Sequence, residues 1–158
     1  MKLITKKDMD GLIEKAAAND RKRTNLNIHD QSSDPIQRLF VAAQKDSYFR
    51  PHRHPKTWEF ALILKGLFDV LIFDDHGKIT DRLSVGPDAP ITAFELPAGM
   101  WHAWIPMTES AMFFETKQGP YDPKTAAEFA PWSPAEGSEE VAEFVKRLRD
   151  ATVGEQAG

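Results

Sequence analysis

Seven short stretches of strand-forming residues, separated by turn sequences, fill the chain between residues 39 and 117. They are residues 39–43, 59–64, 67–73, 78–85, 91–96, 103–105 and 111–117. Lys65-Gly66 and the run from Asp74 to Gly77 interrupt apolar segments where a hairpin needs residues with positive φ, and Gly86-Pro87 makes a further break. So many strands in a short length of chain predict a β-sandwich or barrel.

A helix is expected before the strands. Thr5 can cap its first turn together with Asp8, and apolar residues then recur at helical spacing, which predicts a helix over residues 5–18. Residues 19–35 are polar and rich in turn-forming types. We therefore expect an ordered loop or lid there.

A second helix is expected near the C-terminus. Ser138 can cap it, and an apolar stripe follows in Val141, Phe144, Val145 and Leu148, which predicts a helix that ends near residue 150. The expected single domain consists of a helix and loop (1–36), a barrel core (37–118), a C-terminal cover and helix (119–152) and a disordered tail (153–158).

Length and composition exclude several classes of protein. A chain of 158 residues fits one domain, and its net charge of −4 gives no broad attraction for a phosphate backbone, so we expect no nucleic-acid partner. No segment has the roughly 20 apolar residues of a membrane span, and none resembles a signal peptide, so we expect a cytoplasmic protein without membrane association. Because the chain has no cysteine, a metal site has to use imidazole, carboxylate or amide groups.

The strand that follows His54 has two apolar faces. Alternation puts Glu59, Ala61 and Ile63 on one face. The other face carries Trp58, Phe60, Leu62 and Leu64. One face can line the barrel, while the other needs cover from the N-terminal helix or from a second subunit. A homodimer is therefore expected.

Three histidines and a glutamate have the spacing of a metal site. His52 and His54 leave the same face of an extended strand about 7 Å apart. Pro55 cannot continue a central ladder, so the chain turns there and brings Glu59 in from the next strand. His102 follows the tight turn Pro97-Ala98-Gly99, which can aim it into the same cavity. Such a set binds one divalent ion and does not choose among Zn, Fe, Mn, Ni and Co.

The histidines also have simpler interpretations. On their own, His52 and His54 would be two surface histidines in a loop, and only the addition of Glu59 and His102 makes metal binding the better interpretation. His76 lies in an expected hairpin turn and is interpreted as solvated.

Two segments resemble the motifs of the cupin superfamily. Residues 52–66, HRHPKTWEFALILKG, resemble the first motif, with its two histidines, its glutamate and its closing glycine. Residues 97–102, PAGMWH, resemble the core of the second motif, PxGxxH. The resemblance implies an all-β cupin, a double-stranded β-helix or jelly-roll barrel, flanked here by the two helices. Pro106 and Ile91 depart from the second motif, which often has Asn and Gly there, but neither departure removes a ligand.

Further segments resemble the WbuC family of cupin-fold metalloproteins. They are residues 25–29 (NLNIH), 34–38 (DPIQR), 47–54 (SYFRPHRH), 119–122 (GPYD) and 129–132 (FAPW). Members of that family are associated with bacterial surface-polysaccharide gene clusters. The resemblance therefore implies a cupin metal site and a sugar derivative as the small polar partner.

Polar side chains outside the metal set are candidates for catalysis or binding. Tyr48 and Glu115 can act as general acid or base if their strands face the cavity, and are otherwise ordinary strand residues. Arg38 and Arg50 can bind an anionic group through their guanidinium forks, or can form ion pairs with nearby acids. Arg53 lies between two ligand histidines, so its side chain is expected to point to the opposite face.

Two residues of the N-terminal loop complete the candidate substrate-binding set. They are Asn25 and His29, and His29 is equally well interpreted as a loop histidine held by backbone groups. Trp101 and Trp104 can form aromatic walls around a sugar or can simply pack. Trp132 can cover the mouth of the barrel or hold the C-terminal helix.

Three functions fit these features. The first is a metal-dependent isomerase or epimerase for a sugar derivative in surface-polysaccharide (O-antigen or lipopolysaccharide) biosynthesis, with a carboxylate or tyrosine moving the proton. The second is an Fe(II)-dependent dioxygenase, because three His and one Glu can leave two coordination positions free. The third is a non-catalytic protein that binds or senses a small polar ligand.

Overall fold

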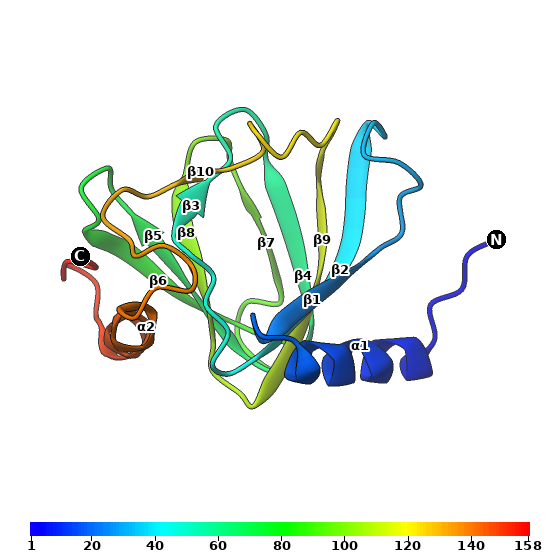
Figure 1. Cartoon of the computed structure of the whole chain (residues 1–158), viewed down its shortest axis with the longest axis horizontal. Helices are drawn as coiled ribbons and strands as arrows, with labels where there is room; N and C mark the ends of the chain where they lie inside the picture. The colour runs from blue at the N-terminus through cyan, green and yellow to red at the C-terminus, as the bar shows by residue number, and fades with distance from the viewer.

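Two antiparallel sheets of five strands each face one another across the interior of the molecule (Figure 1). The computed structural model describes residues 1–158. The first sheet has the order β1-β2-β9-β4-β7 and the second the order β10-β3-β8-β5-β6. The predicted all-β, double-sheet architecture is confirmed.

The strands agree closely with those expected from the sequence. The first sheet consists of β1 (Arg23–Asn27), β2 (Ile36–Gln44), β9 (Ser110–Gln118), β4 (Glu59–Lys65) and β7 (Ala93–Leu96). The second consists of β10 (Glu128–Phe129), β3 (His52–Arg53), β8 (Trp101–Pro106), β5 (Phe68–Phe73) and β6 (Ile79–Val85). All seven predicted strands are present, and the prediction lacks only β1, β3 and β10.

The main core lies between the two sheets. It joins Val41, Ala61 and Phe113 of the first sheet to Val70 and Trp104 of the second. The rings of Trp104 and Phe113 stack with their centroids 4.2 Å apart. This contact sets the distance between the two sheets at the point where Trp104 and Phe113 meet.

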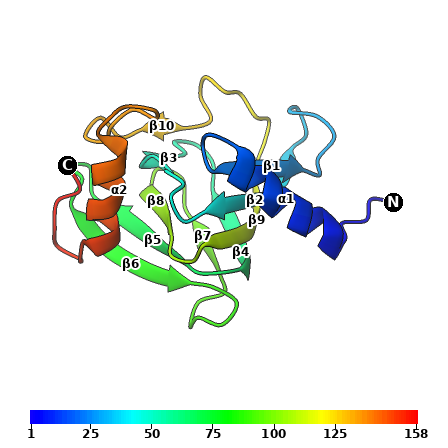
Figure 2. The same ribbon diagram turned by 60° about the horizontal axis from the view of Figure 1, so that its bottom comes forward.

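Each helix packs against the outer face of one sheet (Figure 2). α1 (Lys6–Ala18) packs Leu12 and Ala16 against Ala42 and Met112 of the first sheet. α2 (Val141–Asp150) packs Phe144, Val145 and Leu148 against the second sheet. Both predicted helices are confirmed, and Thr5 forms the expected capping box with Asp8. Neither helix is long and apolar enough to span a membrane.

The expected loop over residues 19–35 contains a strand. β1 lies at the edge of the first sheet, where Asn25 pairs with Val41 of β2 in antiparallel register. Leu26 is the one apolar residue of this strand and packs with the cluster under α1. The strand therefore has too few apolar residues to show an alternating pattern in the sequence.

The C-terminal tail also differs from expectation, because residues 153–158 pack instead of being disordered. The Glu155 carbonyl accepts a hydrogen bond of 2.9 Å from the amide of Ile79, and the Gly154 amide donates one of 2.8 Å to the Ile79 carbonyl. Ala157 is completely buried. The tail thus pairs with the start of β6, although its small and polar residues give no hydrophobic signal.

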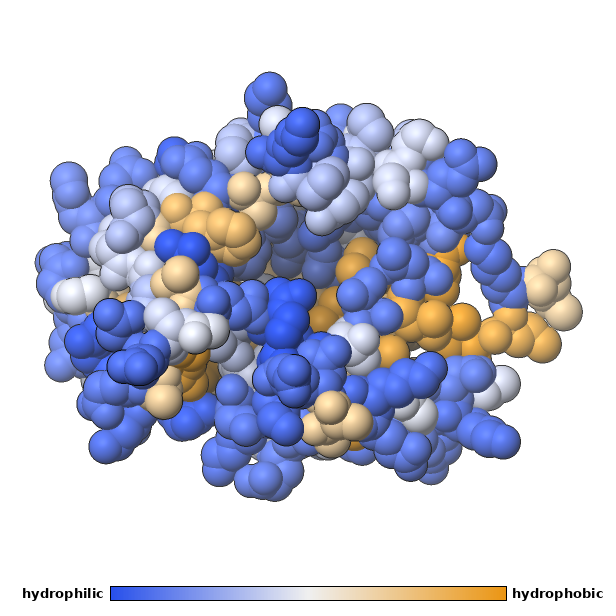
Figure 3. Space-filling model, viewed as in Figure 1, coloured by the Kyte–Doolittle hydropathy of each residue, from blue (hydrophilic) through white to orange (hydrophobic).

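The outer face of the first sheet is only partly covered. α1 packs over β1 and β2 and reaches the edge of β9. Phe60 and Leu62 on the outer side of β4 are half-buried, and Leu64 is 38% exposed. Apolar side chains gather on the side of the molecule where β1, β2 and the N-terminal segment lie (Figure 3). Within one chain, the N-terminal helix therefore covers only part of this apolar face.

A charge introduced into the tail tests its packing. Ala157 has no exposed surface, whereas Val153 is 57% exposed. We expect Ala157→Asp to lower the free energy of unfolding by about 2 kcal/mol or more, because an unpaired buried carboxylate is costly. Val153→Asp is the control and should change it by less than about 0.5 kcal/mol. Urea unfolding measures both, and equally small effects would contradict the packed tail.

Candidate metal centre

The pairing of β3 with β8 brings two of the predicted ligands together. His52 lies directly opposite His102 in this antiparallel pair, and their ring centroids are 4.4 Å apart. Residues directly opposite each other on neighbouring strands present their side chains on the same face. Two histidines from distant parts of the sequence therefore meet at one point of the second sheet.

His54 and Glu59 reach the same point from the segment that links the two sheets. The chain leaves β3 after Arg53 and enters β4 of the first sheet at Glu59. The Gly99 amide donates a hydrogen bond of 2.8 Å to the His54 carbonyl. Gly99 has a φ of +83°, a conformation that favours glycine. The turns that precede Glu59 and His102 thus hold each other in place.

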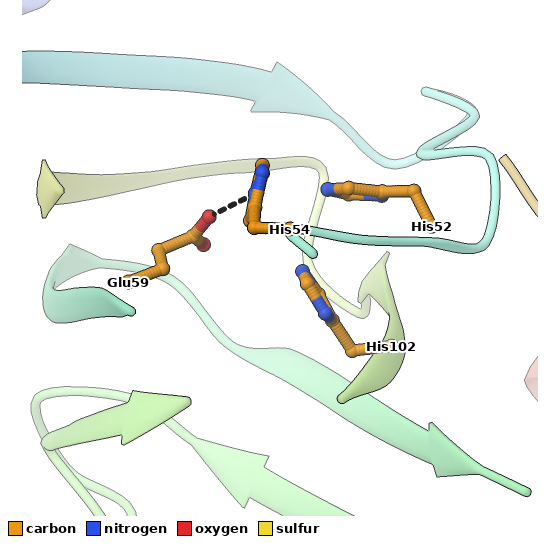
Figure 4. Close-up of side chains that lie close together, drawn as sticks. All are labelled: His52, His54, Glu59 and His102. Carbon is orange, nitrogen blue, oxygen red and sulfur yellow. Dashed lines mark ion pairs between the residues drawn. The ribbon is translucent and has the colours of Figure 1, made fainter. Parts of the chain in front are cut away.

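All four predicted ligands converge (Figure 4). Each offers one ligand atom, and these atoms all lie within 4.8 Å of one another. His54, Glu59 and His102 are buried, whereas His52 is partly exposed. The sequence therefore predicted this cluster correctly, residue by residue.

Backbone carbonyls orient the three imidazole rings. The Nδ1 atoms contact the carbonyl oxygens of Arg50 (His52, 2.9 Å), Met100 (His102, 2.9 Å) and Ala126 (His54, 2.5 Å). A ring that donates its Nδ1 proton to a carbonyl presents the lone pair of Nε2 on its other side. All three rings can therefore present Nε2 to a common centre.

The cluster fits a metal ion. Nε2 of His102 is buried and has no hydrogen-bond partner in the chain. A buried polar atom without a partner costs about 1–3 kcal/mol, and a cation at this position would satisfy it. Three imidazoles and one carboxylate suit Zn, Fe, Mn or Ni, so the donor set supports a bound metal ion without identifying it.

The protonation of the cluster also suits metal binding. Burial lowers the pKa of His52 and of His102, which keeps both rings neutral near pH 7. Burial acts in the same direction on His54, but the hydrogen bond and charge of Glu59 outweigh it and raise the pKa of His54. His54 Nε2 lies 2.7 Å from Glu59 Oε2. A proton therefore competes with a metal ion more strongly at His54 than at His52 or His102.

A second carboxylate and a lysine lie beside Glu59. Lys117 is directly opposite Glu59 in the β4–β9 pair, and its Nζ lies 4.0 Å from Glu59 Oε2 and 2.5 Å from Glu115 Oε1. Burial raises the pKa of Glu115, and the charge of Glu59 adds to this effect. Burial would lower the pKa of Lys117, but the charges of Glu115 and Glu59 outweigh it and raise this pKa.

Lys117 is the functional candidate that the sequence analysis missed. Successive side chains of a strand alternate between its faces, so residues 115 and 117 of β9 share a face. Once Glu115 is considered as a cavity residue, this alternation identifies Lys117 as well.

The charged cluster opens into a cavity of about 600 Å³ between the sheets. Asn25 and Asn27 of β1 form part of a polar wall, and Phe49, Trp104 and Phe113 contribute an apolar one. The volume lies within the range of sites that bind small molecules. The cavity is therefore large enough for a small polar molecule next to His52 and Glu59, the two predicted metal ligands that line it.

Proteins of known structure share this fold. An oxalate oxidase in complex with the substrate analogue glycolate has a TM-score of 0.56 and 17% sequence identity, and the match covers 73% of this chain and 58% of that chain. The DMSP lyase DddQ from Ruegeria pomeroyi DSS-3 has a TM-score of 0.55 and 20% identity, and covers 72% of this chain and 54% of that chain. The cupin domain of Schizosaccharomyces pombe Cnp3 has a TM-score of 0.51 and 10% identity over 61% of each chain. These likenesses show the fold alone, and the fold is that of a cupin.

The sequence identifies the family. The family model described as a domain of unknown function, DUF6016, matches residues 4–85. The chain belongs to DUF6016. No curated protein matches it in sequence. The chain spans only 58% of the oxalate oxidase and 54% of the DMSP lyase, so it matches part of each of those proteins.

Three of the remaining candidate residues of this DUF6016 protein line the cavity. They are Asn25, His29 and Glu115. The Asn25 side-chain amide donates a hydrogen bond of 2.6 Å to Asn27 Oδ1. His29 Nδ1 lies 3.1 Å from the backbone amide of Arg38, so this ring is also held by backbone, as its simpler interpretation expects.

Tyr48 does not face the cavity, contrary to its interpretation as a catalytic group. Its ring packs edge-on against Phe144 of α2, with centroids 6.0 Å apart. Its hydroxyl donates a hydrogen bond of 3.0 Å to the Pro134 carbonyl, and burial raises its pKa to about 12. Tyr48 lies outside the inner faces of the sheets, in the core under α2, where it cannot reach a ligand.

Arg38 and Arg50 also lie away from the cavity, contrary to their interpretation as substrate-binding residues. Alternation along β2 puts Gln37 on the inner face and Arg38 on the exposed outer face. Arg50 donates hydrogen bonds of 3.0 Å to the side chain and to the carbonyl of Ser133. Arg50 therefore holds the segment that follows β10.

The aromatic candidates divide between the two faces of the second sheet. Trp104 lines the cavity, whereas Trp101 and Trp132 belong to the outer core with α2. Arg53 points to the outer face, as expected, and lies 4.4 Å above the Trp101 ring. Trp132 packs against Phe73, so it holds the C-terminal segment and does not cover the cavity.

Removal of one histidine tests the centre. We expect one divalent ion per chain. Loss of a group that only supports a metal ligand weakens metal binding by roughly 10- to 100-fold, and we expect His102→Ala to weaken it by more, because this variant lacks one of the ligands. His76→Ala is the control, because His76 is exposed in the turn before β6. Elemental analysis gives the metal content, and EDTA should lower the melting temperature of the wild type and of His76→Ala only. Equal metal content in all three proteins would contradict this assignment.

Proposed function

We propose that this protein is a metal-dependent isomerase acting on a sugar derivative, with His52, His54, Glu59 and His102 as its metal ligands. The observation that carries the proposal is a second buried carboxyl group, Glu115, in the cavity wall beside Glu59. Burial and the charge of Glu59 raise the pKa of Glu115. A carboxyl group with a raised pKa is suited to take up and return a proton near neutral pH.

The choice between isomerisation and epimerisation depends on how many side chains in the cavity can transfer a proton to or from the substrate. A divalent ion, when bound, polarises a carbonyl or hydroxyl oxygen of the substrate. Glu115 would take a proton from the hydroxyl-bearing carbon of the substrate and return it to the neighbouring carbonyl carbon, while the hydroxyl proton passes to the carbonyl oxygen and Lys117 offsets the charge of the carboxylate. Epimerisation at one carbon needs a second group on the opposite side of the substrate. Because Tyr48 lies outside the cavity, isomerisation is the better fit.

We further propose that the protein is of the WbuC type and serves surface-polysaccharide synthesis. The support is the resemblance of several segments to that family, and some of these segments border the cavity. Asn25 and His29 belong to the first of them and Tyr121 to another, and all three line the cavity. The substrate is then a sugar derivative used in such a pathway.

Isotope exchange tests the isomerase. The holoprotein is incubated in heavy water with a panel of sugar phosphates and nucleotide sugars, and mass spectrometry detects deuterium bound to carbon. We expect Glu115→Gln to reduce incorporation by about 100-fold or more, because proton transfer by a positioned group contributes about that much. Its metal content should stay unchanged.

Glu109→Gln is the matched control, because the Glu109 side chain is 91% exposed just before β9. It should incorporate deuterium at the wild-type rate. Consumption of oxygen without deuterium incorporation would contradict the isomerase and favour an Fe(II)-dependent dioxygenase. A ligand that raises the melting temperature without either reaction would favour a binding protein.

We also propose a homodimer that covers the outer face of β4. Phe60 and Leu62 are half-buried and Leu64 is 38% exposed there, beyond α1. An apolar sheet face of this kind is normally covered. Sedimentation velocity should give the mass of a dimer, and Leu64→Glu should give a monomer with unchanged metal content. A wild-type monomer at micromolar concentration would contradict the proposal.

A further inference from the structure

The charged side chains around the cavity form a balanced set. Those that line it are Arg21, Arg23, Lys117, Glu59 and Glu115. Glu136 lies behind the two arginines, with an oxygen 2.7 Å from Arg21 Nε and another contact of 3.0 Å to Arg23 Nη2. Lys117 lies between Glu115 and Glu59. Three cations therefore face three carboxylates, and the histidines add nothing to this balance once His54 has lost the proton with which an ion competes.

A divalent ion disturbs the balance. The ion would add two positive charges, and no further carboxylate lines the cavity to offset them. Excess charge in a largely buried space is unfavourable unless it is paired. A ligand that carries a negative charge would supply the missing partner, whereas a neutral or cationic ligand of the same shape would not.

The cavity walls indicate the rest of the ligand. The hydrogen bond between Asn25 and Asn27 uses the Asn25 amide nitrogen and the Asn27 carbonyl oxygen. The Asn25 carbonyl oxygen and the Asn27 amide nitrogen remain for a ligand, as an acceptor and a donor that suit hydroxyl groups. Trp104 and Phe113 belong to the apolar wall of the cavity, and their surfaces suit the C–H groups of a carbon chain.

We propose that the ligand of this cavity is a sugar acid, a polyhydroxylated compound with one carboxylate, and this inference rests on the proposed metal site. It narrows the sugar derivative of the proposed function to an acidic one. Lys117 is then a binding residue, because it is the lining cation nearest to the metal ligand Glu59.

A series of probes that differ mainly in charge tests this inference. Gluconate, sorbitol and glucamine share a six-carbon polyhydroxylated chain and carry a negative, no and a positive charge. Isothermal titration calorimetry measures their binding to the metal-loaded protein and to the EDTA-stripped protein. We expect gluconate to bind the loaded protein at least about tenfold more tightly than sorbitol, glucamine to bind most weakly, and the preference to disappear after stripping.

Two lysine variants locate the effect. Lys117→Met should weaken gluconate binding by about tenfold and leave sorbitol binding unchanged, because it removes one positive charge from the wall. Lys45→Met is the control, since Lys45 is exposed and pairs with Glu109 outside this cavity. Circular dichroism and metal analysis establish that each variant is folded and loaded. If Lys117→Met does not fold, the probe series on the wild type still decides the inference.

Several outcomes would overturn the inference. They are equal binding of gluconate and sorbitol, no binding of any probe, and a gluconate preference that persists in the stripped protein. Failure of the isomerase proposal is distinguishable from these outcomes. Tight gluconate binding with no deuterium incorporation into any substrate would support the acidic ligand and contradict the isomerase. Deuterium incorporation into neutral sugars without a preference for gluconate would support the isomerase and contradict the acidic ligand.

Discussion

The pairing of β3 with β8 is the contact on which the candidate site depends, because it puts His52 opposite His102. β3 has only two residues and cannot be stable by itself. β10 pairs with its other edge, and the Gly99 amide holds the carbonyl of His54 just after it. Arg50 adds hydrogen bonds to the segment after β10. Loops and short bridges therefore provide the rigidity that a long strand would otherwise give.

The two sheets contribute different chemistry to the site. The three imidazoles come from β3, β8 and the turn after β3, whereas Glu59, Glu115 and Lys117 come from β4 and β9 of the first sheet. The Trp104–Phe113 stack joins the two sheets nearby. The separation of the sheets therefore fixes how far the charged groups lie from the imidazoles, and mutations in this stack should affect both sets together.

The sequence predicts the metal cluster better than it predicts the rest of the cavity. Strand alternation, a proline and a glycine turn determine where His52, Glu59 and His102 lie, and these signals are local. The positions of Tyr48 and Arg50 depend on the path of the segment before β3, which passes under α2 and is fixed by tertiary contacts with Phe144 and Ser133. Local patterns carry no information about such contacts.

The other differences have related physical causes. β1 is polar because Asn25 and Asn27 face a cavity instead of a core, so its sequence looks like a loop. The tail after α2 pairs through backbone groups of Glu155 and Gly154, and any sequence can supply those groups. Sequence patterns detect burial of apolar side chains, and these segments are held by other interactions.

Glu59 connects the fold of the cavity to its chemistry. Its buried charge is balanced by His54 at 2.7 Å and by Lys117 at 4.0 Å. The protein therefore compensates this carboxylate with its own groups, and the fold does not depend on an ion in the way that small zinc domains do. The large apolar clusters between and outside the sheets supply the stability instead. Because His54 gives up its proton when an ion binds, acid should oppose metal binding at His54 before it affects His52 or His102, whose pKa values are lowered by burial.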